Sequence, residues 1–345
     1  MTSVESEVIN LQDQDLKFES YRFFGVPFKV SFDLSDSAEI YRKTYGHLKE
    51  NPEFGEFENA ITFRVFSESL ENGAKAIVVE NGEIDHLANV FRRGSNRHRF
   101  KIEEAAAGEA GFYQVADAFL GYKPVMLIGE RTCFFLDDER WRAYAESVIF
   151  HTVLSQISDH FVMHAGVVSV NGQAVILCGE ANKGKTTLTL ALVREGFKFL
   201  SDEVAFIDRK RGIVQPFPRA LGLREKTLSM FSELDHQIKR QPTQSLSGDE
   251  KWLVDIDDIF PESRAGSAEA SAIFFLEGFA ERTTLTPMTS ADALLQCTRF
   301  SHTAEDNPIQ SMLAVADVVQ GAKCFRLYSG TVSETVKVVA ATVKG

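Results

Sequence analysis

Cysteine is scarce in this chain of 345 residues, and its four cysteines stand far apart. They are Cys133, Cys178, Cys297 and Cys324, and no C-x-x-C pair occurs among them. This spacing lacks the usual sequence signature of a zinc site or of a redox dithiol. Cys178 falls within an apolar run, so we expect it to be a small core residue.

Long apolar runs, internal repeats and low-complexity blocks are missing as well. No apolar run approaches the length of a membrane span, and the polar, acidic residues 1–15 do not have the pattern of a secretory signal peptide. Basic residues are outnumbered, because 37 Lys and Arg stand against 49 Asp and Glu, for a formal net charge of -12. This charge argues against a general binder of nucleic acid or of anionic membranes. We therefore expect a cytoplasmic protein with neither partner.

The remaining composition is that of a globular protein, with 44% hydrophobic and 25% charged residues, and the length suffices for two domains. Residues 1–136 are rich in strand-like runs and aromatic residues, which predicts a β-rich α+β N-terminal recognition domain. A helix is predicted from about residue 137 to 160, because apolar residues recur there at helical spacing. We place the domain boundary just before this helix, so that residues 137–345 form an α/β catalytic domain.

One basic cluster stands out in the acidic N-terminal half. It consists of Arg92, Arg93, Arg97, Arg99 and Lys101, around Gly94-Ser95-Asn96. The cluster is either a dock for an anion or an acidic partner, or the solvated tip of a hairpin.

The most specific pattern lies between residues 166 and 208. Asn171-Gly172 separates two apolar runs, which predicts a β-hairpin. The second run, Ala174–Cys178, suits a buried parallel strand. Residues 179–186 then match G-x-x-x-x-G-K-[ST], a helix is predicted from Thr186 to Glu195 with Gly196 as its cap, and a strand follows at Phe197–Leu200.

The loop predicts a nucleotide site, because consecutive backbone N–H groups and a helix N-terminus favour phosphate oxygens. Lys185 can reach the β- and γ-phosphates, and the Thr186 hydroxyl can ligate Mg²⁺. The predicted nucleotide-binding residues are Gly179, Glu180, Ala181, Asn182, Lys183, Gly184, Lys185, Thr186 and Thr187.

The acidic pair Asp202 and Glu203 follows Lys185 by one helix and one short strand. Adjacent parallel strands would place both carboxylates beside the phosphates. One carboxylate could hold Mg²⁺ and the other could accept a proton from an attacking hydroxyl, in either order. The alternative is a solvated exit from the strand.

Three segments together resemble a known family. Met163-His164-Ala165-Gly166-Val167, the loop GEANKGKTT and Ser201-Asp202-Glu203 resemble the catalytic domain of HPr kinase/phosphorylase and of HPr-kinase-like proteins. The resemblance is specific over residues 163–208 and does not extend before about residue 130. It implies a P-loop kinase fold related to phosphoenolpyruvate carboxykinase, with ATP and Mg²⁺ as cofactors. It also implies that His164 lies near the transferred phosphate as a fourth catalytic residue with Lys185, Asp202 and Glu203; the alternative is a histidine bonded to backbone.

The chain departs from the resembled pattern in three places. Asn182 stands where the bacterial enzymes usually have Gly, and Glu203 stands where they have Asp. The Arg-bearing signature of the phosphorylase reaction is missing, so the resemblance does not extend to dephosphorylation or to HPr as substrate. The bacterial enzymes are typically hexamers, which leaves a homo-oligomer open, although no assembly motif is visible.

Downstream residues could complete the site. Arg219, Arg224 and Lys226 are expected to contact phosphate or substrate, or else to lie on the surface. Residues 237–251 could form a lid, and Asp255, Asp257 and Asp258 are predicted to be a solvated turn because they lack the full calcium-loop pattern.

The sequence therefore predicts a kinase that phosphorylates a hydroxyl group of a protein, a peptide or a small molecule. A nucleotide-binding switch or scaffold without a phosphoryl acceptor is the alternative, and a catalytically inactive structural relative is a third reading.

Overall fold

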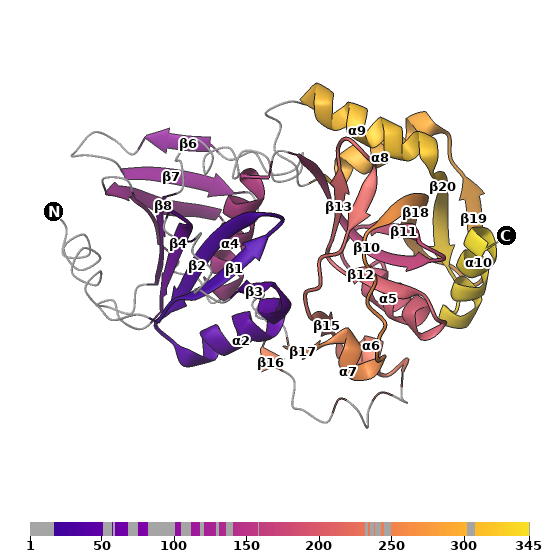
Figure 1. Cartoon of the computed structure of the whole chain (residues 1–345), viewed down its shortest axis with the longest axis horizontal. Coiled ribbons are helices and arrows are strands. Elements are labelled where there is room, and N and C mark those ends of the chain that lie inside the picture. Colours follow the sequence, from indigo (N-terminus) through magenta and orange to yellow (C-terminus); the bar gives the residue numbers. More distant parts are fainter. Residues whose placement is uncertain are drawn as a thin grey trace. The chain divides into compact units, whose positions relative to one another are not determined.

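The computed structural model describes residues 17–50, 57, 59–67, 75–81, 101–104, 112–117, 121–128, 131–135, 141–157, 159–231, 234, 238, 243–244, 250–301 and 308–344. Between residues 101 and 135 it describes the backbone alone. The chain divides into two compact units, Met1–Ser158 with Gln244–Glu250, and Asp159–Thr243 with Lys251–Gly345. It is a mixed α/β protein with several sheets, as the sequence predicted (Figure 1).

The first unit is built on a nine-stranded sheet with the order β3-β1-β2-β4-β5-β9-β8-β7-β6. Its strands are β1 (Glu19–Phe23), β2 (Val26–Phe32), β3 (Lys49–Glu50), β4 (Ile61–Phe66), β5 (Ala76–Glu80), β6 (Lys101–Glu104), β7 (Phe112–Asp117), β8 (Gly121–Ile128) and β9 (Arg131–Phe135). Its helices are α2 (Ser35–Tyr45), the 3-10 turn η2 (Gly46–Leu48) and α4 (Trp141–Ser155). Only β2 and β4 pair in parallel, among the pairings described for this sheet.

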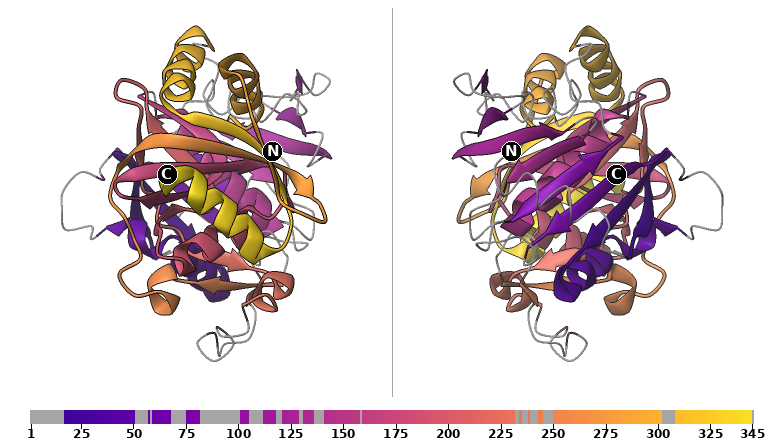
Figure 2. Two further views of the ribbon diagram at one scale, coloured as in Figure 1. Left: turned by 90° about the vertical axis from the view of Figure 1, so that its right-hand side faces the viewer. Right: turned by 90° about the vertical axis from the view of Figure 1, so that its left-hand side faces the viewer.

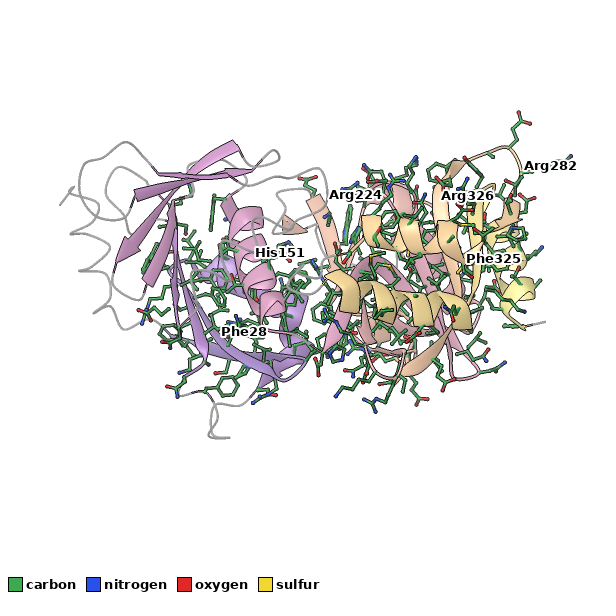
Figure 3. All side chains as sticks on the ribbon, turned by 90° about the horizontal axis from the view of Figure 1, so that it is seen from above. Phe28, His151, Arg224, Arg282, Phe325 and Arg326 are labelled. Carbon is green, nitrogen blue, oxygen red and sulfur yellow. The ribbon has the colours of Figure 1, made fainter. Side chains whose placement is uncertain are left out.

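An aromatic core places α4 in the first unit. Tyr21 stacks on Phe28, and Phe23 lies 6.4 Å from Phe150 of α4 between ring centroids. The Tyr45 hydroxyl donates to Glu146, also on α4, at 2.7 Å. Because these contacts hold α4 against the first sheet, the boundary between the units follows this helix, whereas the sequence analysis placed it before the helix. Figure 3 labels Phe28 within this core.

The second unit is built on an eight-stranded sheet with the order β11-β10-β13-β14-β18-β20-β19, in which β12 pairs with β10 and β11 also pairs with β18. Its strands are β10 (His160–Val170), β11 (Gln173–Gly179), β12 (Lys198–Ser201), β13 (Val204–Asp208), β14 (Ile213–Gln215), β18 (Ala268–Phe279), β19 (Thr284–Pro287) and β20 (Lys323–Ser329). Its longer helices are α5 (Lys185–Arg194), α8 (Ser290–Arg299), α9 (Pro308–Gly321) and α10 (Val332–Lys344). A separate three-stranded sheet has the order β15-β17-β16, with β15 at Leu221–Leu223, β16 at Thr243–Gln244 and β17 at Glu250–Val254; the short helices are α6 (Glu225–Leu228) and α7 (Ile256–Ile259).

Helices cover both faces of this sheet, which accounts for the apolar runs in its central strands. Helices α5 and α10 pack on one face and α8 and α9 on the other, as Figures 1 and 2 show. The central strands β11, β18 and β20 are parallel, so their carboxyl ends meet at one edge. The hairpin prediction is confirmed: β10 and β11 are antiparallel, and Asn171 and Gly172 turn between them with φ of 52° and 76°.

None of the helices in the described parts of the chain is long and apolar enough to cross a membrane.

Two phenylalanines of β18 provide a matched pair for a stability measurement. Phe274 is fully buried and stacks on Phe325, labelled in Figure 3, at 5.3 Å, whereas Phe279 is 63% exposed. We expect Phe274→Ala to lower the free energy of unfolding by about 3–5 kcal/mol, because it leaves a cavity. Phe279→Ala should change it by less than about 0.5 kcal/mol. Urea unfolding followed by circular dichroism measures both, and equal losses would contradict the placement of these rings.

Candidate functional site: a glycine loop beside an acidic pair

The glycine loop, Gly179–Thr186, links the end of β11 to the first turn of α5. Asn182 and Gly184 have left-handed backbone conformations, with φ of 64° and 91°. Asparagine adopts this region more readily than most residues, so Asn182 fits where the resembled enzymes have Gly. The first N–H groups of any α-helix lack acceptors within the helix, so the amino end of α5 favours an anion.

Close packing favours glycine at the start of this loop. A Cβ on Gly179 would lie 3.1 Å from both the Cβ and the carbonyl oxygen of Leu276 on β18. Beyond this contact the loop opens to solvent: Glu180, Ala181 and Asn182 are exposed. Lys183, Gly184, Thr186 and Thr187 are half-buried. The loop therefore has one face against the sheet and one that a ligand can reach.

Lys185 is the buried cation of the loop, with 8% of its surface exposed. Its ammonium donates to the carbonyl oxygens of Gly179 at 2.7 Å and Glu180 at 3.1 Å. Burial lowers the pKa of Lys185, while the negative charges of Glu203 and Asp202 act in the opposite direction. The ammonium thus lies within the loop, close to both members of the acidic pair.

The acidic pair reaches the loop by a route that differs from the predicted one. Strand β12 does not lie next to β11, because β10 lies between them and is antiparallel to both. Since both neighbours run opposite to β10, β11 and β12 run in the same direction and their carboxyl ends share one edge of the sheet. Asp202 and Glu203 follow β12 directly and so lie beside the glycine loop.

Asp202 is a buried carboxylate, 8% exposed, with the side chain of Thr186 beside it. Its Oδ1 atom has no hydrogen-bond partner among the described residues. Burial, and next the charge of Glu203, raise the pKa of Asp202 to about 7, against the lowering effects of Thr186 and Lys185. An unsatisfied buried carboxylate oxygen is costly, so a ligand that pairs with Oδ1 would relieve this cost.

Glu203 lies in a more open environment, with 42% of its side chain exposed. Its carboxylate is 3.5 Å from His164 Nδ1 and 3.9 Å from Arg219 Nη1. Its backbone carbonyl accepts from His164 Nδ1 at 3.0 Å, so that nitrogen carries the ring proton and Nε2 of the neutral ring is an acceptor. Burial lowers the pKa of His164, which favours the neutral ring. His164 is therefore bonded to the backbone, as the alternative interpretation expected, and it also lies beside the acidic pair.

The segment from Arg224 to Leu228, which contains α6, contacts the glycine loop from outside the sheet. Arg224, labelled in Figure 3, hydrogen-bonds to Asn182 Oδ1. The hydroxyls of Thr227 and Thr187 are 3.1 Å apart. The structure thus brings Arg219 and Arg224, two of the three basic residues singled out from the sequence, to the acidic pair and to the loop.

Two further residues border the loop without any local signal in the sequence. The Arg299 guanidinium, at the end of α8, is 3.5 Å from Glu180 Oε1. The ring of Phe279, at the end of β18, lies 3.5 Å from the position that a Cβ on Gly184 would occupy. Both come from elements about a hundred residues away, so only tertiary structure identifies them.

Within the described ranges, no three His, Cys, Asp or Glu side chains gather as a metal site would require. The side chains of the predicted metal ligands Thr186 and Asp202 nevertheless lie beside each other, and Glu203 is the next residue in the chain. This set suits Mg²⁺, which keeps several waters and binds through one or two carboxylates plus substrate phosphates.

Three other features singled out from the sequence are the acidic turn, the basic cluster and the cysteines. Asp255 caps the short helix α7, and Arg264 bonds to Asp255 and lies 3.0 Å from Asp257. Of the basic cluster, Arg92, Arg93, Arg97 and Arg99 fall outside the described residues, as does most of the 237–251 segment. Cys178, Cys297 and Cys324 are free and buried, as expected for Cys178.

The raised pKa of Asp202 predicts a gain in stability on Asp202→Asn. Between pH 4 and 7 the folded protein retains a proton that the unfolded chain, with a carboxyl pKa near 3.8, has released. Stability is therefore lost as pH rises through this window, by a few kcal/mol at most. In EDTA and without nucleotide, we expect Asp202→Asn to melt at a higher temperature than the parent at pH 8 and to lose this advantage at pH 4. A parent that is the more stable at pH 8 would contradict this.

Comparisons with known proteins give matches among solved structures and none for sequence. No protein-family model matches the chain, and no curated protein matches it. Among solved structures, it is similar to the Hpr(Ser) kinase/phosphatase from Coxiella burnetii. The identity is 13%, the match covers 53% of this chain and 99% of that one, and the TM-score is 0.26. This TM-score is too low for the likeness to bear on activity.

Proposed function

We propose that this chain is an ATP- and Mg²⁺-dependent kinase of the HPr-kinase-like type that phosphorylates a hydroxyl acceptor. One observation carries the proposal: the buried Asp202 carboxylate lies beside Thr186, at the start of α5, and has an unsatisfied oxygen. A hard cation that prefers oxygen ligands would satisfy that oxygen. The loop that precedes Thr186 has the left-handed turns and the buried lysine that a phosphate chain requires.

In this proposal the loop and Lys185 bind the nucleotide. The amides of residues 179–187 and the amino end of α5 surround the phosphates. Lys185 exchanges its two carbonyl acceptors, Gly179 and Glu180, for β- and γ-phosphate oxygens. The exchange needs no large movement, because the ammonium already lies inside the loop. A cation held there neutralises charge on the γ-phosphoryl group as that group is transferred.

The two carboxylates have different roles, one in binding the metal and one in accepting the proton. Asp202 is buried beside Thr186, so these two residues would hold Mg²⁺, which would supply positive charge against the phosphates of the nucleotide. Glu203 is exposed between His164 and Arg219, so it faces an acceptor arriving from solvent. The acceptor oxygen bonds to the γ-phosphorus, the bond from that phosphorus to the bridging oxygen breaks, and ADP leaves with the electron pair. Glu203 receives the hydroxyl proton.

The acceptor is a hydroxyl of a protein, a peptide or a small molecule. We would follow γ-labelled phosphate from Mg-ATP in cell extract, with Asp202→Asn protein as the control. Label that reaches one acceptor only with the parent protein supports the kinase and identifies the acceptor class. Label found solely as free phosphate points to a nucleotide-binding switch without an acceptor.

Replacement of Lys185 tests the phosphate site. We expect Lys185→Ala to lower phosphoryl transfer by about a hundredfold or more, because it removes the cation that stabilises developing charge. Lys323→Ala is the matched control: Lys323 is exposed at the amino end of β20, away from the edge that carries the loop. It removes the same charge and should leave transfer unchanged. Full transfer by Lys185→Ala would refute the assignment.

The division between the two carboxylates predicts different magnesium requirements. Asp202→Asn should block transfer and raise the Mg²⁺ concentration needed for tight ATP binding, because a metal ligand is lost. ATP binding should largely persist at saturating Mg²⁺. Glu203→Gln should lower the transfer rate about a hundredfold while the Mg²⁺ requirement stays that of the parent protein. Titrations of ATP binding against Mg²⁺ separate the two roles, and equal shifts in both variants would show that the division is wrong.

A further inference from the structure

Phe279 is the most exposed aromatic side chain of the described residues, at 63%. A single exposed apolar side chain is ordinary on a protein surface, so its position matters more than its exposure. Its ring carbons Cε1 and Cζ lie 3.5 Å from where a Cβ on Gly184 would be. Gly184 is the residue that precedes α5, so the ring borders the anion-favouring end of that helix.

The sheet fixes this position. Strand β18 pairs in parallel with β11 up to Gly179, which lies opposite Leu276. Past that pair, a Cβ on Gly278 would lie 3.7 Å from Lys183 Nζ, and Phe279 meets Gly184. The end of β18 therefore runs along the glycine loop from Gly179 to Gly184. The carboxyl ends of parallel strands are where α/β sheets bind ligands.

A basic side chain completes this surface. The Lys226 ammonium, from α6, lies 5.9 Å from the centroid of the Phe279 ring. Arg224 and Thr227, on either side of Lys226, contact Asn182 and Thr187 of the loop and of α5. The ring, the cation and the loop thus belong to one contiguous surface, with an aromatic face at its edge and phosphate-binding groups at its centre.

We propose that Phe279 is the platform on which the base of the bound nucleotide stacks, with Lys226 beside it as a charge for the phosphate chain. This inference rests on the proposed function, because it assigns the base subsite of the same nucleotide. A nucleotide whose phosphates lie on the loop carries a flat, apolar base, and an exposed aromatic ring against that loop offers the matching surface. Stacking accepts any base, because every base has a π-face. ATP and GTP should therefore bind with similar affinity.

The test compares ATP with inorganic tripolyphosphate, which has the phosphates but no base. Calorimetry with Mg²⁺ gives both dissociation constants without any assay of activity. We expect Phe279→Ala to weaken ATP binding by about 5- to 100-fold, the range of one base–aromatic stack. Tripolyphosphate binding should change by less than about twofold. Phe279→Trp should restore ATP binding. Leu313→Ala is the control, because Leu313 is also an exposed apolar side chain, at 60%, and lies on α9.

Several outcomes would overturn the inference. Equal losses for ATP and tripolyphosphate would show that the ring shapes the loop and does not stack on a base. If Phe279→Ala binds ATP as tightly as the parent protein, the base does not stack on Phe279, and the proposed kinase function is unaffected. A parent protein that binds neither ligand would refute the proposed function itself, and the base subsite with it.

Discussion

Strand β10 is the constraint on which the candidate site depends. It pairs in antiparallel fashion with β11 on one side and with β12 and β13 on the other, so it holds the glycine loop and the acidic pair at one level of the sheet. Ala165 shows this most directly: it lies opposite Cys178, and its N–H donates to the carbonyl of Glu203 at 3.1 Å. The neighbouring His164 and Gly166 are fixed by the same ladder. A shift of register in β10 would separate the loop from the carboxylates.

Gly166 shows how tightly this arrangement is packed. A Cβ at this position would lie 2.5 Å from Thr189 Oγ1 of α5 and 3.9 Å from Asp202 Oδ1. Both of these oxygens are buried and lack hydrogen-bond partners among the described residues. Buried polar atoms without partners reduce stability, and they concentrate where a protein binds something polar. Because Gly166 has no side chain, Thr189 of α5 can lie close to the acidic pair.

Local patterns in the sequence predicted the parts of the site that are local in structure. Asn171-Gly172 fixed the hairpin because type I′ turns need residues that tolerate positive φ. The loop and α5 followed from the spacing of Gly179, Gly184 and Lys185. The position of β12 was predicted wrongly, because nothing in residues 198–201 reveals that β10 separates this strand from β11.

The remaining site residues depend on contacts between distant segments. Arg299 contacts Glu180, which lies 119 positions earlier in the chain. Phe279 lies against Gly184 because β18 pairs with β11. Neither carries a motif, because an arginine at the end of a helix and a phenylalanine at the end of a strand are common. The boundary after α4 was missed for the same reason: the apolar face of a helix does not identify the sheet that it covers.

The consecutive residues Asp202 and Glu203 place two carboxylates in different environments. Asp202 is buried against α5 and has a raised pKa, whereas Glu203 is exposed and lies near His164 and Arg219. Successive side chains at the end of a strand point in different directions. Two consecutive residues can therefore place their carboxylates in different surroundings at the same edge of a sheet. Two acids in different environments can take different roles in one site. In the proposed function, the buried acid serves the nucleotide and its metal, and the more exposed acid serves the acceptor.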